Sequence, residues 1–367
     1  MIVPKRIRRI AINTGGGDAP GLNAVIRAVT LASINRGWEV LGICDGYGSF
    51  LGGEPLKKLT RTAVHGIAPL GGTILGTTNK GNPFETRVKL PGMKRPRLAA
   101  ELVVEGLREA KIDGLIAVGG DGSLSIAYKL MQMGVPVIGV PKTIDNDLMY
   151  TNVTFGFDTA VQTATEALDK MHSTAAAHER VMVVEVMGRH AGWIALNAGI
   201  SGSCHVILIP EIPFDIAKVC DHLKARRARG RHYAIVCVAE GAVTRRGAPV
   251  YRTPNVRGRE GRLGGIGEWV AQEIERCMGW ETRTLVLGHL QRGGSPSTFD
   301  RLLGLRYGAA AVRLAAAGLW GHMVTYEPPN MGSIPLEEIA QRTKRVPVDG
   351  DTVLTARELG IGFGDGV

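Results

Sequence analysis

The stretch PKTIDND, residues 141–147, sets two carboxylates, Asp145 and Asp147, two positions apart, with Lys142 just before them. It follows the apolar run GVPVIGV, which is typical of a buried strand. One carboxylate can accept the proton of an attacking hydroxyl while the other orients water, a metal or a neighbouring side chain. An Asx turn with helix-capping carboxylates is the structural alternative.

Two glycine-rich segments also follow apolar runs. NTGGGDAPGLNA contains Gly16 and opens a helix, so its backbone N–H groups can approach a phosphate, although a tight structural turn explains it equally well. AVGGDGS places Asp121 between glycines, and a carboxylate beside a phosphate loop is favourable when Mg²⁺ lies between them. Ser123 has a second interpretation, as a cap of the following helix. A donor-phosphate site and a base at one sheet edge form the minimal apparatus for phosphoryl transfer.

Several basic side chains lie at the ends of expected strands in the second half of the chain: Arg180, Arg189, Arg283, His289 and Arg292. Each of them alone is more often an ordinary surface residue. Together, in an otherwise apolar framework, they suit a phosphorylated substrate, because guanidinium groups bind phosphate in a bidentate way.

Short β-branched runs alternate with helix-patterned segments, as in RIAINT, APGLNAVIRAVTLASINRG and EVLGIC, and the second half repeats this order. The alternation predicts right-handed βαβ units and parallel sheets covered by helices on both faces. At 367 residues the chain exceeds the usual size of one domain, so we expect two α/β lobes. In such sheets ligands bind beyond the carboxyl ends of the strands, where the motifs above lie.

The chain carries 44 lysine and arginine residues against 34 aspartate and glutamate residues, and its net charge of +10 suits an acidic ligand or a nucleic acid. The densest basic cluster, KARRARGR at residues 224–231, contains no aromatic residue that could stack on bases. A solvated helix end or a site for a small anion therefore explains it better. We expect no nucleic-acid partner.

The five cysteines are far apart and show no CxxC spacing: Cys44, Cys204, Cys220, Cys237 and Cys277. This spacing predicts reduced thiols in the core rather than a zinc site or a disulfide framework. The N-terminal residues lack the apolar stretch and cleavage site of a signal peptide, and no run of about 18 apolar residues occurs. We expect a cytoplasmic protein without membrane contacts.

The segments GGGDAPGLNAVIR, GGDGS, PKTIDND, HERVMVVEVMGRHAGW, AEGA and ETRTLVLGHLQRGGSPSTFDR occur in the order seen in the 6-phosphofructokinases. This resemblance runs from about residue 8 to about residue 320. It implies a phosphofructokinase fold of two Rossmann-like three-layer lobes with mostly parallel sheets. The implied lobes are 1–156 with 290–340 for the phosphoryl donor and 157–289 for the sugar phosphate, with 341–367 as a tail packed back on them.

The resemblance also implies the activity, which is the Mg²⁺-dependent phosphorylation of fructose 6-phosphate at its 1-hydroxyl in glycolysis. The donor contacts carried over are Gly16, Asn79, Lys80, Gly120, Asp121, Gly122 and Ser123, with Asp121 on magnesium. Asp145 is then the base, and Thr143 touches the transferring phosphoryl group.

The sugar phosphate has its own set of implied contacts. Arg189, with Met187 and Gly188 beside it, holds the substrate and steadies charge in the transition state. Glu240 binds sugar hydroxyls, and Arg292 and His289 grip the 6-phosphate. Arg180 and Arg283 resemble arginines that reach this site from an adjacent subunit, which implies a homo-oligomer, a tetramer or a dimer.

Two positions bear on the donor, which is ATP or pyrophosphate in this family. Pyrophosphate users typically carry Asp at the position of Gly122, where its bulk and charge oppose the α-phosphate of ATP. They also typically carry Lys at the position of Lys142, which this chain shares. An excluding carboxylate is harder to work around than an extra cation, so we expect ATP, with pyrophosphate as the alternative.

Regulation is not carried over. ADP-activated bacterial enzymes have Glu after GGC, whereas the corresponding stretch here is GSCH, with His205 in that place. We therefore do not expect their ADP and phosphoenolpyruvate control, although ARGRH nearby can bind some anion. The tail resembles that of a subgroup with the mixed donor signature, and its PLEEIAQR predicts a short helix.

Two further functions remain open. A seven-carbon sugar phosphate, such as sedoheptulose 7-phosphate, suits the same arginine cluster as acceptor. A binding protein without turnover is disfavoured, because Asp121, Asp145 and Arg189 are all in place.

Overall fold

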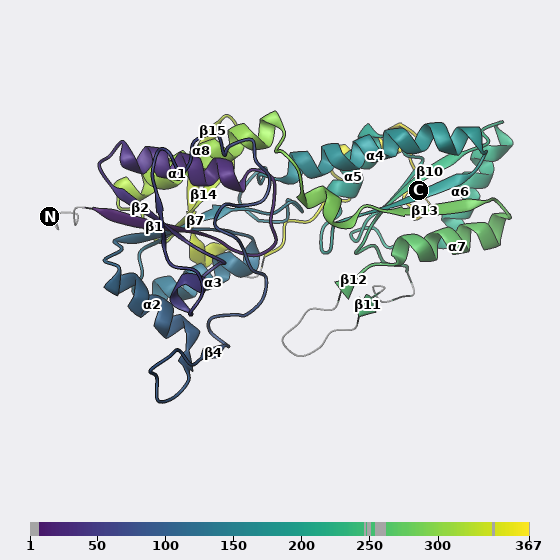
Figure 1. Ribbon diagram of the computed structural model, residues 1–367. Helices are drawn as coiled ribbons and strands as arrows, with labels where there is room; N and C mark the ends of the chain where they lie inside the picture. Colours follow the sequence, from purple (N-terminus) through teal and green to yellow (C-terminus); the bar gives the residue numbers. More distant parts are fainter. Residues whose placement is uncertain (1–6, 246, 248–250, 254–261, 340–341, 367) are drawn as a thin grey trace. The chain divides into compact units, whose positions relative to one another are not determined.

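The computed structural model describes residues 7–245, 247, 251–253, 262–339 and 342–366 (Figure 1). The chain divides into two compact units. Unit 1 takes its described residues from Met1–Ile144, Leu148–Asp158 and Arg292–Arg342. Unit 2 takes them from Asp145–Asp147, Thr159–Gln291 and Thr343–Val367. The triplet Asp145–Asp147 is thus an excursion into unit 2 between two segments of unit 1.

Unit 1 is built on a seven-stranded sheet. Its inner strands are parallel and lie in the order β14 (His322–Glu327), β7 (Val137–Pro141), β6 (Gly114–Gly119), β1 (Arg9–Thr14) and β2 (Glu39–Ile43). An antiparallel strand covers each edge, β15 (Asn330–Pro335) beside β14 and β3 (Lys57–Leu59) beside β2.

Helices cover both faces of this sheet (Figure 1). Side chains alternate along a strand, so Ile10 and Ile12 of β1 face one core and Ala11 faces the other. α1 (Leu22–Ile34) and α8 (Thr298–Ala316) contribute to the first core. α2 (Ala99–Glu109) and α3 (Asp121–Gln132) contribute to the second.

The order of the strands reverses between β1 and β6. The chain runs from β1 through α1 to β2 on one side, and from β6 through α3 to β7 on the other. The loops that leave the carboxyl ends of two such strands diverge, and the space between them is where open α/β sheets bind ligands. Both glycine-rich segments lie at this point.

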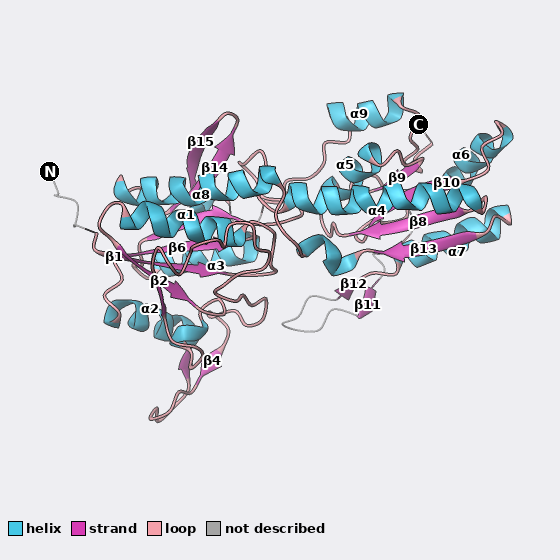
Figure 2. Cartoon of the chain, turned by 45° about the horizontal axis from the view of Figure 1, so that its top comes forward, coloured by secondary structure: helices cyan, strands magenta, loops and turns pink. Residues whose placement is uncertain are grey.

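Unit 2 contains a parallel four-stranded sheet in the order β13 (Thr282–Val286), β8 (Val181–Val186), β10 (Ala234–Ala239) and β9 (Val206–Leu208). α6 (Ile216–Ala228) and α7 (Ile266–Met278) share an apolar core with one face. α5 (Trp193–Ser201) packs on β9 and β10, and Figure 2 shows α4 (Phe157–Ala177) alongside it. The prediction of two three-layer α/β lobes with mostly parallel sheets is confirmed.

Cys220 on α6 and Cys277 on α7 form a disulfide. The expectation that all five cysteines are reduced was therefore wrong for this pair. The two residues are 57 positions apart, and the packing of α6 against α7 brings their Cα atoms to 6.7 Å. Sequence spacing alone carries no sign of such a tertiary contact. Cys44, Cys204 and Cys237 are free thiols.

The C-terminal segment from residue 343 packs within unit 2. α9 (Asp351–Glu358) lies against α5, as Figure 2 shows. Beyond it, Gly362 forms a parallel bridge with Val206 of β9, and Ile207 N donates to Gly362 O at 2.9 Å. The tail therefore extends the edge of the sheet.

The predicted short helix in PLEEIAQR begins as a 3₁₀ turn at Leu336–Glu338, while residues 340 and 341 lie outside the described part of the chain. Two small antiparallel pairs complete the fold, β4 (Arg87–Val88) with β5 (Arg97–Leu98) and β11 (Tyr251–Thr253) with β12 (Arg262–Leu263). Among the described residues, no helix combines the length and the apolar character needed to cross a membrane.

Candidate active site

The glycine loops after β1 and β6 lie side by side in unit 1. Gly15 N donates to Val118 O at 2.9 Å. A β-carbon at Gly15 would lie 2.7 Å from Ser123 Oγ, so no larger residue fits there without a shift. The two predicted donor segments, around Gly16 and Gly120–Ser123, are thus brought together by backbone pairing.

A third loop joins them. Gly16 N donates to Thr78 O at 3.0 Å, and Thr77 Oγ1 donates to Gly16 O at 2.7 Å. Asn79 and Lys80 follow directly and are exposed. The structure therefore places these two predicted donor contacts beside the first glycine loop.

Lys142 follows β7 and is buried, with 3% of its surface exposed. Its Nζ donates to Gly17 O, and it would lie 3.4 Å from a β-carbon at Gly16. A buried ammonium group against a glycine loop is a stabilising partner for phosphate oxygens.

The helix α3 begins in the second glycine loop. Its N-cap is Gly120, which makes no side-chain cap, so the alternative role of Ser123 as a cap is not what the structure shows. Asp121 and Gly122 are exposed in the first turn, and a β-carbon at Gly122 would meet nothing within 4 Å. Free N–H groups and the helix dipole favour an anion at such a terminus.

Thr143 and Arg292 also belong to unit 1. Thr143 O accepts a hydrogen bond from Thr154 Oγ1 at 2.7 Å. Arg292 Nη1 donates to Asp18 O at 3.2 Å, so the guanidinium group lies against the first glycine loop. Within unit 1 the structure thus gathers every predicted donor residue, together with Thr143, Lys142 and Arg292.

The remaining predicted residues lie in unit 2. Met187, Gly188 and Arg189 follow β8, and Glu240 follows β10. Glu240 N donates to Val186 O at 2.9 Å, and Gly241 N donates to Gly188 O at 3.1 Å. Gly188 has a φ of +138°, a conformation that only glycine adopts readily. The predicted sugar contacts from two strands are thereby held at one edge of the sheet.

His289 is exposed on the 3₁₀ turn Gly288–Arg292, which Gln291 ties to the same edge. Gln291 is fully buried, accepts a hydrogen bond from Met187 N at 3.3 Å and donates to Gly288 O at 3.1 Å. Sequence reasoning missed this glutamine as a positioning residue. Its only sign was its place inside HLQRGG.

Asp145 and Asp147 flank Asn146 in the short excursion into unit 2. Asn146 is buried and has a φ of +51°, in the left-handed region that asparagine tolerates better than most residues. This conformation sets the directions in which the two neighbouring carboxylates leave the chain.

Comparisons with known proteins identify the family of this chain. The family model described as phosphofructokinase matches residues 9–315. This chain belongs to the phosphofructokinase family.

Similar phosphofructokinases cover nearly the whole chain. A protein of Chloroflexus aggregans named ATP-dependent 6-phosphofructokinase is 52% identical over 98% of each chain. One of Synechocystis named ATP-dependent 6-phosphofructokinase 1 is 48% identical over 98% of this chain and 99% of its own.

Two solved phosphofructokinases confirm the expected fold. The T-state enzyme of Pichia pastoris gives a TM-score of 0.79 at 30% identity, over 97% of this chain and 37% of its own. The pyrophosphate-dependent enzyme of Marinobacter aquaeolei gives a TM-score of 0.78 at 25% identity. The match covers 97% of this chain and 88% of that enzyme's chain.

Arg180 and Arg283 lie at the amino ends of strands in the unit 2 sheet, whereas Met187 and Glu240 lie at the carboxyl ends. Arg180 immediately precedes β8 and Arg283 is the second residue of β13, so both are at the amino ends of strands. They pair with the same carboxylate, Glu281, at 3.2 and 2.6 Å. The structure therefore does not bring them to the predicted sugar contacts of their own chain, which follow the carboxyl ends of β8 and β10.

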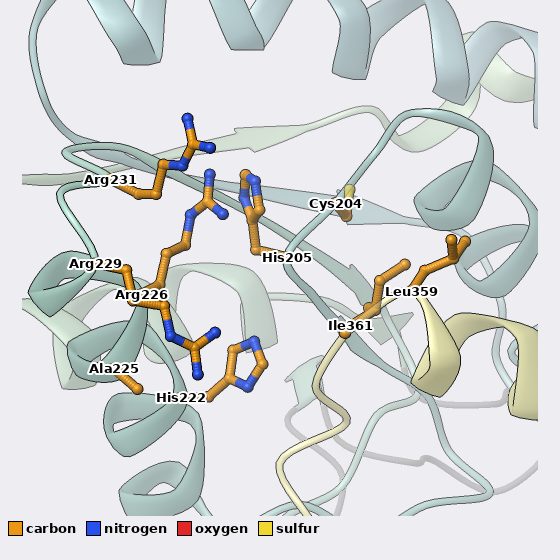
Figure 3. A pocket seen from close by; sticks show the side chains of 10 residues that line it. Cys204, His205, His222, Ala225, Arg226, Arg229, Arg231, Leu359 and Ile361 are labelled. Carbon is orange, nitrogen blue, oxygen red and sulfur yellow. The ribbon is translucent and has the colours of Figure 1, made fainter.

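A basic pocket of about 400 Å³ opens at this same amino edge of the phosphofructokinase sheet (Figure 3). It is lined by Cys204, His205, His222, Ala225, Arg226, Arg229, Arg231, Leu359, Gly360 and Ile361. The basic cluster at 224–231 thus serves both as a helix end and as a pocket wall. Burial, and next the charge of Arg226, lowers the pKa of His205 to about 3. Burial likewise lowers the pKa of His222.

Asp121 remains the residue predicted to hold Mg²⁺. The described residues contain no group of three or more His, Cys, Asp or Glu side chains arranged for a metal. Magnesium keeps several waters and takes one or two carboxylates plus phosphate oxygens, so an exposed carboxylate beside two phosphate-type loops fits that donor set.

Proposed function

We propose that this phosphofructokinase transfers the γ-phosphoryl group of ATP to the 1-hydroxyl of fructose 6-phosphate, giving fructose 1,6-bisphosphate and ADP. The reaction is a phosphorylation step of glycolysis. Relatives named ATP-dependent 6-phosphofructokinase, at 52% and 48% identity over nearly the whole chain, support it.

The observation that carries the choice of donor is the open space at Gly122. A β-carbon there, in the first turn of α3, would meet no other protein atom within 4 Å. ATP needs such room for its α-phosphate and nucleoside, whereas pyrophosphate does not. The buried ammonium of Lys142 already has a partner in Gly17 O and does not occupy that space.

The transfer itself follows from the roles of a few side chains. Asp145 takes the proton from the 1-hydroxyl of the sugar. At the same time the hydroxyl oxygen forms a bond to the γ-phosphorus, and the bond from that phosphorus to the bridging oxygen of ADP breaks. Thr143 contacts the moving phosphoryl group, and Arg189 steadies its charge. Glu240 binds sugar hydroxyls, and His289 and Arg292 hold the 6-phosphate.

Asp121 holds Mg²⁺ in this proposal, and the ion, when bound, screens the negative charge of the donor phosphates. The glycine loops and the N-terminus of α3 bind the same phosphates through backbone N–H groups. These contacts leave the γ-phosphorus as the accessible electrophile.

Pyrophosphate is the second candidate donor, favoured by Lys142 and by the structural likeness to a pyrophosphate-dependent enzyme. Sedoheptulose 7-phosphate is the second candidate acceptor, since the same cationic groups suit its phosphate.

Turnover measured with each donor and each acceptor separately tests the proposal. We expect kcat/KM for ATP with fructose 6-phosphate to exceed every other combination by at least about a hundredfold, which corresponds to about 2.7 kcal/mol in transition-state binding. A higher kcat/KM with pyrophosphate than with ATP would identify pyrophosphate as the donor. A higher kcat/KM with the seven-carbon sugar phosphate would identify it as the acceptor.

The assembly and the compartment belong to the same proposal. Arg180 and Arg283 serve the sugar-phosphate site of a second copy, in a homotetramer or a dimer, because they lie at the amino edge of their own sheet. ATP and sugar phosphates are cytoplasmic metabolites, so we place the enzyme in the cytoplasm.

The basic pocket supports one further role, the binding of a small anion. Three arginines line it, and His205 accepts a hydrogen bond from Ile235 N through Nδ1, which leaves Nε2 as a donor. Sulfate should therefore raise the melting temperature of the wild type more than that of an Arg226→Gln variant. Equal increases would assign the cluster to a solvated helix end.

A further inference from the structure

The C-terminal segment 343–346 contacts the two residues that follow the predicted base, Asp145. Lys344 N donates to Asp147 O at 2.8 Å, and Lys344 Nζ donates to Asn146 Oδ1 at 2.9 Å. One tail residue thus holds the DND triplet through both its backbone and its side chain. These contacts lie within unit 2.

The same segment is fixed from its other side by the start of α5. Trp193 Nε1 donates to Lys344 O at 3.0 Å, and Lys344 Nζ lies 5.7 Å from the centroid of the Trp193 ring. A lysine at this distance from an indole face is stabilised by a cation–π interaction. Lys344 therefore has a defined position rather than that of a solvated surface lysine.

Glu211 extends the connection toward the loop that carries Arg189. Val346 N donates to Glu211 Oε1 at 2.9 Å, and Gly192 N donates to both carboxylate oxygens of Glu211 at 3.1 Å. Gly192 is the N-cap of α5, three residues after Arg189. The tail thereby links the triplet that contains the base to the loop that contains the transition-state arginine.

We propose that Lys344 is a positioning residue for phosphoryl transfer, holding Asn146 so that the Asp145 carboxylate is set in register with the Arg189 loop. The inference rests on the function proposed above and gives the tail a chemical role. Lys344 acts through Asn146 and touches no reacting atom. Burial lowers the pKa of Lys344 to about 8, and the nearby Asp147 carboxylate opposes that shift, so the side chain remains largely protonated at neutral pH.

The test is a double-mutant cycle on kcat. Lys344→Met removes the ammonium donor, and Asn146→Gly removes its acceptor while tolerating the positive φ at that position. We expect each single variant to lower kcat with ATP and fructose 6-phosphate by about 10- to 100-fold, with both KM values nearly unchanged. The double variant should be no slower than the slower single variant, because both remove the same link.

Arg345→Met is the matched control, since it removes an exposed cation from the adjacent position of the same segment. Its kcat should equal that of the wild type. Lys344→Arg, which keeps charge and donors, should recover part of the activity lost in Lys344→Met. Unchanged kcat in Lys344→Met, or effects that multiply in the double variant, would overturn the inference.

Two further outcomes distinguish a failure of the inference from a failure of the proposed function. If Lys344→Met does not fold, Asn146→Gly alone decides, because it leaves Lys344 against Trp193, and an unchanged kcat in it overturns the inference. If the wild type phosphorylates no sugar phosphate with either donor, the proposed function fails and the inference fails with it. An active wild type with unaffected variants overturns the inference alone.

Discussion

At the scale of single residues, the proposed site depends on the absence of a side chain at one position, Gly122, and on a carboxylate at another, Asp145. Gly122 leaves space beside the start of α3, and Asp145 supplies a carboxylate in the triplet that enters unit 2. Changing either residue alters one step of the proposed reaction without removing apolar packing. Both are therefore suited to kinetic tests.

Gly122→Asp should depress the use of ATP selectively. The new carboxylate fits sterically, since a β-carbon there meets nothing within 4 Å, but it repels the α-phosphate. We expect kcat/KM for ATP to fall at least about tenfold while that for pyrophosphate is kept or rises. Equal loss with both donors would contradict the donor argument.

Asp145→Asn should retain the fold and substrate binding while removing the base. We expect kcat to fall by about 10²- to 10⁴-fold with KM values close to those of the wild type. Steady-state kinetics, together with an unchanged melting temperature, check this. A variant that keeps the wild-type kcat would exclude Asp145 as the base.

The residues that we propose to contact phosphate or sugar stand out in the sequence because strand-end loops combine glycine with charged residues in a fixed order. Gln291 and Lys344 were not recognisable. Each acts through hydrogen bonds to a distant segment, Gln291 to Met187 and Lys344 to Asn146. A polar residue whose partner lies far along the chain leaves no local pattern.

At the scale of elements, the parallel strands were predictable because their β-branched runs are buried on both faces. The edge strand β3 is less apolar, and the hairpin β14–β15 lies late in the chain. No sequence pattern predicted either of them. A helix end at residues 224–231 was predicted from the sequence, but the disulfide between α6 and α7 was not. Its position depends on how the two helices pack.

Removal of the disulfide should destabilise unit 2. The bond joins residues 57 apart, and a link that closes a loop of this length restricts the unfolded chain, typically by about 2–4 kcal/mol. Cys220→Ser with Cys277→Ser should lower the midpoint of chemical unfolding to that of the wild type under a thiol reductant. If a thiol reductant lowered the unfolding midpoint of the double variant as much as that of the wild type, the prediction would be contradicted.

The depressed pKa of His205 makes part of the stability depend on pH. A histidine with a folded pKa of about 3 and an ordinary unfolded pKa near 6.5 adds stability that is complete above pH 6.5 and is lost as the pH falls toward 3. The slope reaches about 1.4 kcal/mol per pH unit. His205→Gln should therefore lose less unfolding free energy between pH 7 and pH 5 than the wild type, as denaturant titrations at both pH values can measure. Identical losses would contradict the role given to burial.

At the scale of the whole molecule, the proposed assembly makes each sugar-phosphate site depend on two chains. Arg283 lies at the amino edge of its own sheet, and Met187 and Glu240 lie at the carboxyl edge. A net charge of +10 keeps the surface attractive to anionic substrates but disfavours the approach of like-charged copies, so the contacts between copies must offset that repulsion. Light scattering at low and high salt measures this balance.

Mixing two inactive variants tests the shared site. A hybrid of Asp145→Asn and Arg283→Ala subunits contains some sites with an intact base from one chain and an intact arginine from the other. We expect co-refolded mixtures to regain up to about a quarter to a half of the wild-type activity, although each variant alone has little. No recovery in confirmed hybrids would place Arg283 outside the partner's site.

The way the two units divide the chain has a consequence for its synthesis. Unit 1 requires the segment Arg292–Arg342, and unit 2 requires Thr343–Val367, whose Gly362 extends the β9 edge. Neither unit can therefore close while the ribosome is still translating the middle of the message. The nascent chain stays partly folded, with the edge of β9 unpaired, until residues 343–366 have emerged.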